Sequence, residues 1–162
     1  MENQLTRGKD WVESLLSLMG TPLKVDTDGF ETIADDPDSC WLNIDTQSLS
    51  QEQVDSLIGV KGKNIDAIQY LANTILNLFQ EDSAQSSYTV EINGYRVSRY
   101  QELREIFDTA ADRVKETGEE VELNGLSSAE RKQVHAFFQN SAELVTESRG
   151  QEPNRTLVVK LR

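Results

Sequence analysis

The sequence is short of the residues that would support a disulfide framework, a zinc site or a membrane span. Its single cysteine, Cys40, and single histidine, His135, exclude an internal disulfide and a Cys/His zinc site. No apolar run reaches the length of about 18 residues that a membrane span needs, and the amino terminus lacks the order of a signal peptide. We therefore expect a cytoplasmic protein without a cofactor, a metal or direct membrane insertion.

Positive charge is also scarce, since 16 Lys and Arg face 28 Asp and Glu, for a net charge of -12. Such a balance opposes phosphate binding, which depends on cations that release counterions. The acids are concentrated at the front: residues 1–56 hold 12 acids and 3 bases, whereas residues 57–162 hold 16 acids and 13 bases. A chain of this kind can bind nucleic acid if the acidic part faces away.

Apolar spacing predicts an α+β fold in two small domains, residues 1–96 and 97–162, without a long flexible linker. The first domain is predicted to contain a helix over 4–19, two antiparallel strands between 23 and 45, a helix capped by Ser50 and Gln53, a helix with an apolar face from Ile65 to Phe79, and a strand over 88–92. The second is predicted to contain a helix capped by Ser98 and Gln101 that ends at Gly118, a strand at 121–123, a helix from Ser127 through Phe138, and strands at 144–146 and 157–161.

A glycine-framed basic loop, Gly59-Val60-Lys61-Gly62, stands between two predicted helices and is followed by Lys63. Glycines let a sugar-phosphate backbone approach closely, and the amides that begin the next helix attract anions. The bases of a bound strand are expected in the groove between that helix and the adjacent strand, read by apolar walls and backbone polar groups. On spacing alone, an ordinary turn between helices is the competing interpretation.

A second candidate site lies on the predicted helix that ends at Phe138. Arg131 and His135 are four residues apart, so they share a face and can present a guanidinium fork and an imidazole to a phosphate or base. The competing interpretation is a histidine packed beside an apolar stripe. Further bases that can extend this surface are Lys132, Arg155, Lys160 and Arg162.

Catalytic motifs find no support, so we expect a protein that is not an enzyme. The glycine loop is not a P-loop, because Asn64 stands where Ser or Thr must meet magnesium. No nucleophile elbow accompanies His135. The acids from Asp35 to Asp38 surround a proline and are typical of a solvated turn, which makes a metal-dependent nuclease the weakest alternative.

Two segments resemble the bacterial Jag family, also called KhpB or EloR. Residues 57–71 read LIGVKGKNIDAIQYL and are similar to the family's LIGKKGKTLDALQYL, and residues 146–155 read TESRGQEPNR and are similar to its TESEGEEPNR. Residues 94–96 and 130–135 fit the same family. The resemblance covers nearly the whole chain, apart from the family's amino-terminal Jag domain, so a short form is expected.

The resemblance implies a KH domain of type II topology, with three helices on a three-stranded sheet, followed by an Arg-x-x-x-His domain, with two helices and a small sheet. Both domains are then expected to bind single-stranded RNA, with single-stranded DNA as an alternative ligand, in a post-transcriptional regulator or RNA chaperone. The implied clamp is Gly59 to Gly62, and the implied signature pair is Arg131 and His135. Val60 departs from relatives that carry two bases between the glycines.

The main alternative to RNA binding is a protein-interaction adaptor. KH-family domains can pair with another KH protein or with a second copy, and some lineages act near the cell-envelope or elongation machinery. The acidic front half, with Trp11 and Trp41 as candidate anchors, can serve a basic partner.

Overall fold

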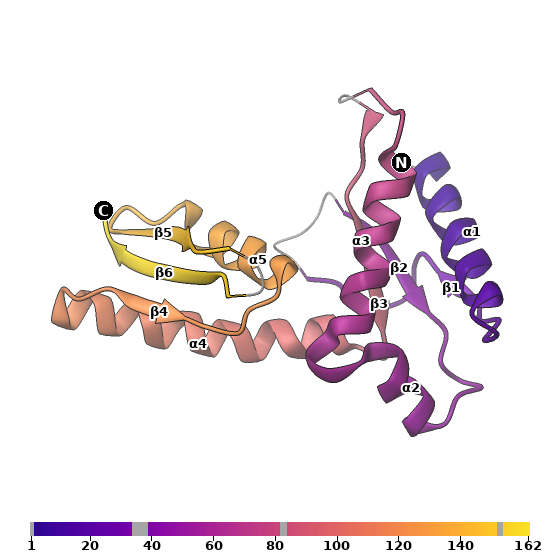
Figure 1. Cartoon of the computed structure of the whole chain (residues 1–162), viewed down its shortest axis with the longest axis horizontal. Coiled ribbons are helices and arrows are strands. Elements are labelled where there is room, and N and C mark those ends of the chain that lie inside the picture. Colours follow the sequence, from indigo (N-terminus) through magenta and orange to yellow (C-terminus); the bar gives the residue numbers. More distant parts are fainter. Residues whose placement is uncertain (1, 34–38, 82–83, 152–153) are drawn as a thin grey trace. The chain divides into compact units, whose positions relative to one another are not determined.

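The computed structural model describes residues 2–33, 39–81, 84–151 and 154–162. The chain divides into two compact units, Met1–Ser98 and Arg99–Arg162, each with helices and one three-stranded sheet (Figure 1). The predicted α+β class is therefore confirmed. The acidic segment from Asp35 to Asp38, considered above as a metal site, lies outside the described residues.

The first unit follows the predicted order of helix, strand, strand, helix, loop, helix and strand. Its elements are α1 (Glu2–Leu18), β1 (Val25–Asp26), β2 (Cys40–Ile44), α2 (Gln51–Ile58), the 3-10 turn η1 (Val60–Gly62), α3 (Lys63–Asn77) and β3 (Tyr88–Ile92). The sheet order is β1-β2-β3, with β1 antiparallel to β2 and β2 parallel to β3. Helix α1 packs on β2, α3 packs on β3, and the two helices contact each other (Figure 1).

The apolar face of α3 differs from the prediction, because only part of it is buried. The side chains that enter the core are Ile65, Ile68, Ala72 and Leu76. Leu71 and Ile75 lie beside this stripe and are 40% and 46% exposed. The helix ends at Asn77, and Phe79, predicted to continue the face, is 96% exposed with a φ of 63°. Of the two candidate anchors, Trp41 is buried and cannot serve a partner, whereas Trp11 is partly buried and packs against the core.

The second unit contains two helices and a fully antiparallel sheet with the strand order β4-β6-β5. Helix α4 starts before the division between the units. The elements are α4 (Tyr95–Thr117), β4 (Val121–Leu123), α5 (Ser128–Gln139), β5 (Leu144–Arg149) and β6 (Thr156–Leu161). Its core includes three aromatic side chains, with the rings of Phe137 and Phe138 edge to face at 4.9 Å and Phe107 beside both.

Helix α4 begins at Tyr95 rather than at the predicted Ser98 cap, and the Ser98 amide donates to the Gly94 carbonyl as part of the helix. Glu91, buried at the end of β3, accepts hydrogen bonds from the amides of Arg96 and Val97 instead. Burial raises the pKa of the Glu91 carboxyl, and these amides oppose that rise. A carboxylate from the preceding strand thus satisfies the first turn of the helix.

The other two predicted caps are confirmed, because the capping boxes of α2 and α5 each have both of their hydrogen bonds. Ser50 and Gln53 fix the start of α2, and Ser127 and Glu130 fix the start of α5. Helix α2 leads into the glycine loop, and α5 carries Arg131 and His135.

Candidate nucleic-acid interface

The glycine loop has an unusual backbone conformation. Gly59 ends α2 with a φ of 75°, and its amide donates to the Asp55 carbonyl at 2.8 Å. Gly62 begins α3 with the same φ, and Lys61 between them is also left-handed at 53°. Val60 is 77% exposed, and Lys61 is exposed as well. Left-handed residues of this kind turn the chain sharply between the two helices.

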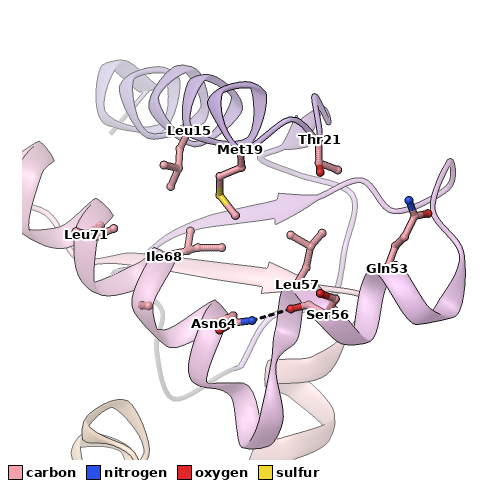
Figure 2. Close-up of a pocket in the computed structure, with 10 residues that line it drawn as sticks. Leu15, Met19, Thr21, Gln53, Ser56, Leu57, Asn64, Ile68 and Leu71 are labelled. Atoms are coloured by element: carbon pink, nitrogen blue, oxygen red, sulfur yellow. Dashed lines mark hydrogen bonds between the residues drawn. The ribbon is translucent and has the colours of Figure 1, made fainter.

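Both glycines are required by close neighbours as well as by their backbone angles. A Cβ atom on Gly59 would lie 2.7 Å from Cγ of Asn64, and one on Gly62 would collide with the Tyr95 ring. Asn64 also donates from Nδ2 to the Ser56 carbonyl at 2.7 Å, which ties the end of α2 to the start of α3 (Figure 2). Sequence reasoning used Asn64 only to exclude a P-loop and missed this role.

Backbone groups on the outer edge of β3, which borders the predicted base-reading groove, are already occupied by side chains. Three side chains on α3, Gln69, Asn73 and Asn77, recur every four residues and form what we call the amide ladder. Their oxygens accept from the amides of Val90, Tyr88 and Ser86 at 2.9 to 3.0 Å. The nitrogens of Asn73 and Asn77 donate to the carbonyls of Tyr88 and Ser86. Arg96 takes the Val90 carbonyl, so these backbone groups cannot read a base.

Arg131 lies inside the second unit and not on the predicted surface, since it is only 5% exposed. Its Nη1 donates to the Leu126 carbonyl and its Nη2 to the Ser128 hydroxyl, both at 2.8 Å. The guanidinium therefore braces the turn that enters α5. Helical spacing could not indicate this role, because the Leu126 acceptor belongs to the turn and not to the helix face.

His135 is partly buried and connects α5 to β5. Its Nδ1 lies 2.6 Å from the Thr146 hydroxyl, and its Nε2 lies 3.2 Å from the Ser148 hydroxyl. Burial lowers the pKa of the imidazole, and the charges of Arg155 and Arg131 lower it further. The ring is therefore neutral at neutral pH.

The basic surface of the second unit is smaller than its base count suggests. Lys132 and Arg155 are exposed and form no ion pair with a described residue. Lys160, predicted to extend this surface, is paired with Glu147. Arg149 is held by two hydrogen bonds to the Glu120 carboxylate, at 2.7 and 2.9 Å. Acids on the sheet thus neutralise its bases.

Metal-binding clusters and membrane-spanning helices are both missing from the described ranges. No three His, Cys, Asp or Glu side chains gather there in a way that could hold a metal ion. None of the helices in that part of the chain is long and apolar enough to cross a membrane.

The second unit matches a known domain family. Residues 101–161 match the sequence model of the R-3-H domain, which is the Arg-x-x-x-His domain. The second unit contains an R-3-H domain. The prediction of such a domain is thereby confirmed, with Arg131 and His135 inside the matched residues.

The relatives found by sequence are bacterial and carry one name. RNA-binding protein KhpB of Clostridium symbiosum is 31% identical over 115 residues, which is 71% of this chain and 51% of that protein. RNA-binding protein KhpB of Lactiplantibacillus plantarum is 33% identical over 106 residues, or 65% of this chain and 32% of that protein. The protein of that name in Bacillus subtilis is 29% identical over 113 residues, 68% and 53% of the two chains. The predicted homology is confirmed, and the chain spans between a third and about half of these relatives.

Proposed function

We propose that this chain binds single-stranded RNA and is not an enzyme, with the first unit acting as a KH domain of type II topology and the R-3-H domain as a second binding site. The observation that carries the proposal is the loop from Gly59 to Gly62, held in one shape by Asn64 and Tyr95 with Val60 and Lys61 exposed between the glycines. The element order of the first unit and the printed name of the relatives, RNA-binding protein KhpB, support it.

In this proposal the loop holds a phosphate of the strand. Lys61 and Lys63 supply charge, and the start of α3 adds the positive end of its helix dipole. Because contacts on both sides fix the loop, little ordering is needed when the strand binds. Val60 adds exposed apolar surface in place of a second base, which makes the site less dependent on charge alone.

The R-3-H domain contributes a surface around His135. Lys132 and Arg155 are its exposed cations, and Arg131 holds the turn beneath. Two modest sites on one chain gain affinity when both engage the same strand. We place this activity in the cytoplasm, in a post-transcriptional regulator or RNA chaperone, as the resemblance implies; single-stranded DNA is the second ligand to compare.

The test is a loop variant of the full chain, Val60→Asp with Lys61→Asp, whose affinity for a labelled single-stranded RNA octamer is measured by fluorescence anisotropy. We expect binding to fall at least about tenfold, since phosphate contacts at the loop are replaced by repulsion. The matched control is Thr74→Asp with Lys24→Asp, which makes the same charge change at exposed positions outside the loop. Equal loss in both variants, or none in either, would reject the clamp. Circular dichroism verifies that each variant folds.

A protein-interaction adaptor is the second candidate, because the helices of the first unit expose apolar side chains. On α3 these are Leu71 and Ile75, and near the end of α1 they are Leu18 and Met19, which are 86% and 53% exposed. Another KH protein or a second copy could cover this surface. Gel filtration with and without nuclease separates the candidates: a complex that survives nuclease and is lost in Ile75→Asp supports the adaptor.

A further inference from the structure

A groove of about 380 Å³ lies in the R-3-H domain between α4 and β4. Figure 1 shows β4 running beside this helix. The groove is lined by apolar side chains from both elements: Ala110 and Leu123 are buried, Val121 is partly buried, and Ile106 is 42% exposed. Apolar surface that the core of the domain leaves uncovered is therefore open to a partner here.

One side of this groove is an open sheet edge. Strand β4 is at the end of the order β4-β6-β5 and pairs, among the described strands, with β6 alone. Outside that pair, no hydrogen bond joins the backbone of Val121, Glu122 or Leu123 to any described residue. The N–H and C=O groups that point away from β6 are therefore available to an added strand. The edge of β3, by contrast, is occupied by the amide ladder.

The alternation of side chains along β4 indicates what such a strand must carry. Val121 and Leu123 line the groove, so Glu122 between them lies on the opposite face of the sheet. Side chains of an added strand would alternate in the same way, with one set beside Ile106 and the other beside Glu122. The first set should be apolar and the second basic, because opposite charges on neighbouring strands attract.

The charge around the groove also favours a basic partner. Glu105 lines it, and Glu119 and Glu122 lie on or just before β4; all three are exposed and form no ion pair with a described residue. Glu102, also in the lining, is held in an ion pair, and Arg113 is the cation of the groove. The excess of carboxylates repels a phosphate backbone and equally repels the same edge of a second copy.

We propose that this edge binds an extended peptide segment of another protein, in which apolar residues alternate with Lys or Arg, as a fourth strand beside β4. Main-chain hydrogen bonds would supply affinity, and the groove and the carboxylates would supply specificity. The site is separate from the surface around His135, because His135 contacts Thr146 of β5, at the other edge of the same sheet. An RNA strand and a protein segment could therefore occupy one R-3-H domain together.

The first test uses the full chain and three fluorescein-labelled hexapeptides, whose binding is measured by anisotropy. One alternates lysine with valine, the second alternates glutamate with valine, and the third is the lysine peptide with methylated backbone nitrogens. The lysine peptide should bind at least about tenfold more tightly than the other two. Equal binding of all three, or no binding of the lysine peptide, would reject the proposal.

Variants of α4 locate the binding surface. Glu105→Lys should weaken binding of the lysine peptide about fivefold, because a carboxylate of the groove becomes a cation. Asp108→Lys is the matched control: it makes the same charge change at an exposed position of α4 outside the groove and should change affinity less than about twofold. Ile106→Ala should weaken binding by removing an apolar contact. Equal losses in the two lysine variants would mean that the peptide responds to net charge and not to the groove.

Amide hydrogen exchange shows whether the peptide adds as a strand. The lysine peptide should slow exchange of at least one amide within Val121–Leu123 of the wild-type chain and leave the Val134 amide of α5 unchanged. Unchanged exchange in β4 would reject strand addition. If the RNA octamer slows these amides instead, the groove binds nucleic acid. If they are slow in concentrated protein and fast after dilution, a second copy covers the edge, and either result overturns the inference.

Discussion

The guanidinium group of Arg131 donates a 2.8 Å hydrogen bond to the carbonyl oxygen of Leu126, in the turn that leads into α5. The arginine of the Arg-x-x-x-His pair is thus a structural brace, while its neighbour Lys132 is exposed on the same helix. Nucleic-acid contacts of the R-3-H domain are accordingly expected from Lys132, His135 and Arg155.

Substitution of Arg131 should therefore act on stability. Arg131→Ala leaves the Leu126 carbonyl without its charged donor and should lower the free energy of unfolding of the R-3-H domain by about 2 kcal/mol. Lys132→Ala should leave stability unchanged and weaken RNA binding. Urea unfolding followed by the methyl NMR signals of Val134 measures the first effect, and anisotropy the second. A stable Arg131→Ala protein with impaired binding would show that Arg131 contacts RNA directly.

The two glycines at the loop and at the end of β3 provide a matched pair. Gly62 and Gly94 have similar angles, φ of 75° and 71°, but a Cβ on Gly62 collides with the Tyr95 ring, whereas one on Gly94 meets nothing within 4 Å beyond its chain neighbours. Gly94→Ala should cost about 1 kcal/mol for its left-handed backbone. Gly62→Ala should cost at least about 1 kcal/mol more, because the ring must move. Both tryptophans lie in the first unit, so their fluorescence reports urea unfolding. Equal losses in the free energy of unfolding of the two variants would mean that the Tyr95 ring moves aside at no cost.

His135 should make stability fall in mild acid. Its pKa is lowered from 6.5 in the folded chain, so below about pH 6.5 the unfolded state binds more protons than the folded state. The stability that its neutral form contributes is complete above pH 6.5 and is lost as pH falls through the folded pKa. Unfolding followed from pH 7.5 to pH 5 measures this loss.

His135→Gln is the control for that titration, since glutamine keeps a polar side chain that does not ionise. Glu91, whose pKa is raised by burial, titrates in both proteins and cancels in the comparison. The wild type should become less stable relative to the variant as pH decreases. A difference that stays constant with pH would mean that the imidazole has an ordinary pKa.

The salt dependence of RNA binding should be shallow for a protein with two sites. The proposed contacts supply about four unpaired cations, Lys61, Lys63, Lys132 and Arg155, and each adds roughly 0.7 to the slope for a single strand. The slope of log affinity against log salt should therefore be no steeper than about -3. Lys160→Ala should not change it, because Glu147 already neutralises that lysine. A much steeper slope would require cations outside these sites.

Features that depend on neighbours in the chain were predicted well from sequence. The order of elements and the capping boxes at Ser50 and Ser127 follow from spacing within a few residues, and the structure confirms them. The Ser98 cap failed for a tertiary reason. The carboxylate of buried Glu91 accepts hydrogen bonds from the first turn of α4. The strand pattern around Glu91 in the sequence gives no indication of this role.

The site was predicted less completely, because its decisive contacts join separate elements. The loop residues were identified from their glycines, but Asn64 and Tyr95, which fix the loop, became visible only in three dimensions. The prediction placed Arg131 on the correct helix but as an exposed residue, whereas its side chain is buried. Helical periodicity shows which residues share a face, and it cannot show that a preceding turn folds back over one of them.

The amide ladder also determines how the first unit meets other chains. Both the N–H and the C=O of Tyr88 are taken by Asn73, so the outer side of β3 has no open hydrogen-bonding groups there for a foreign strand. Exposed sheet edges are where proteins aggregate, and this one is sealed by the helix that follows the glycine loop. The Tyr88 and Val90 amides should accordingly exchange with deuterium only when α3 lifts from the strand, so that helix and strand open as a single unit.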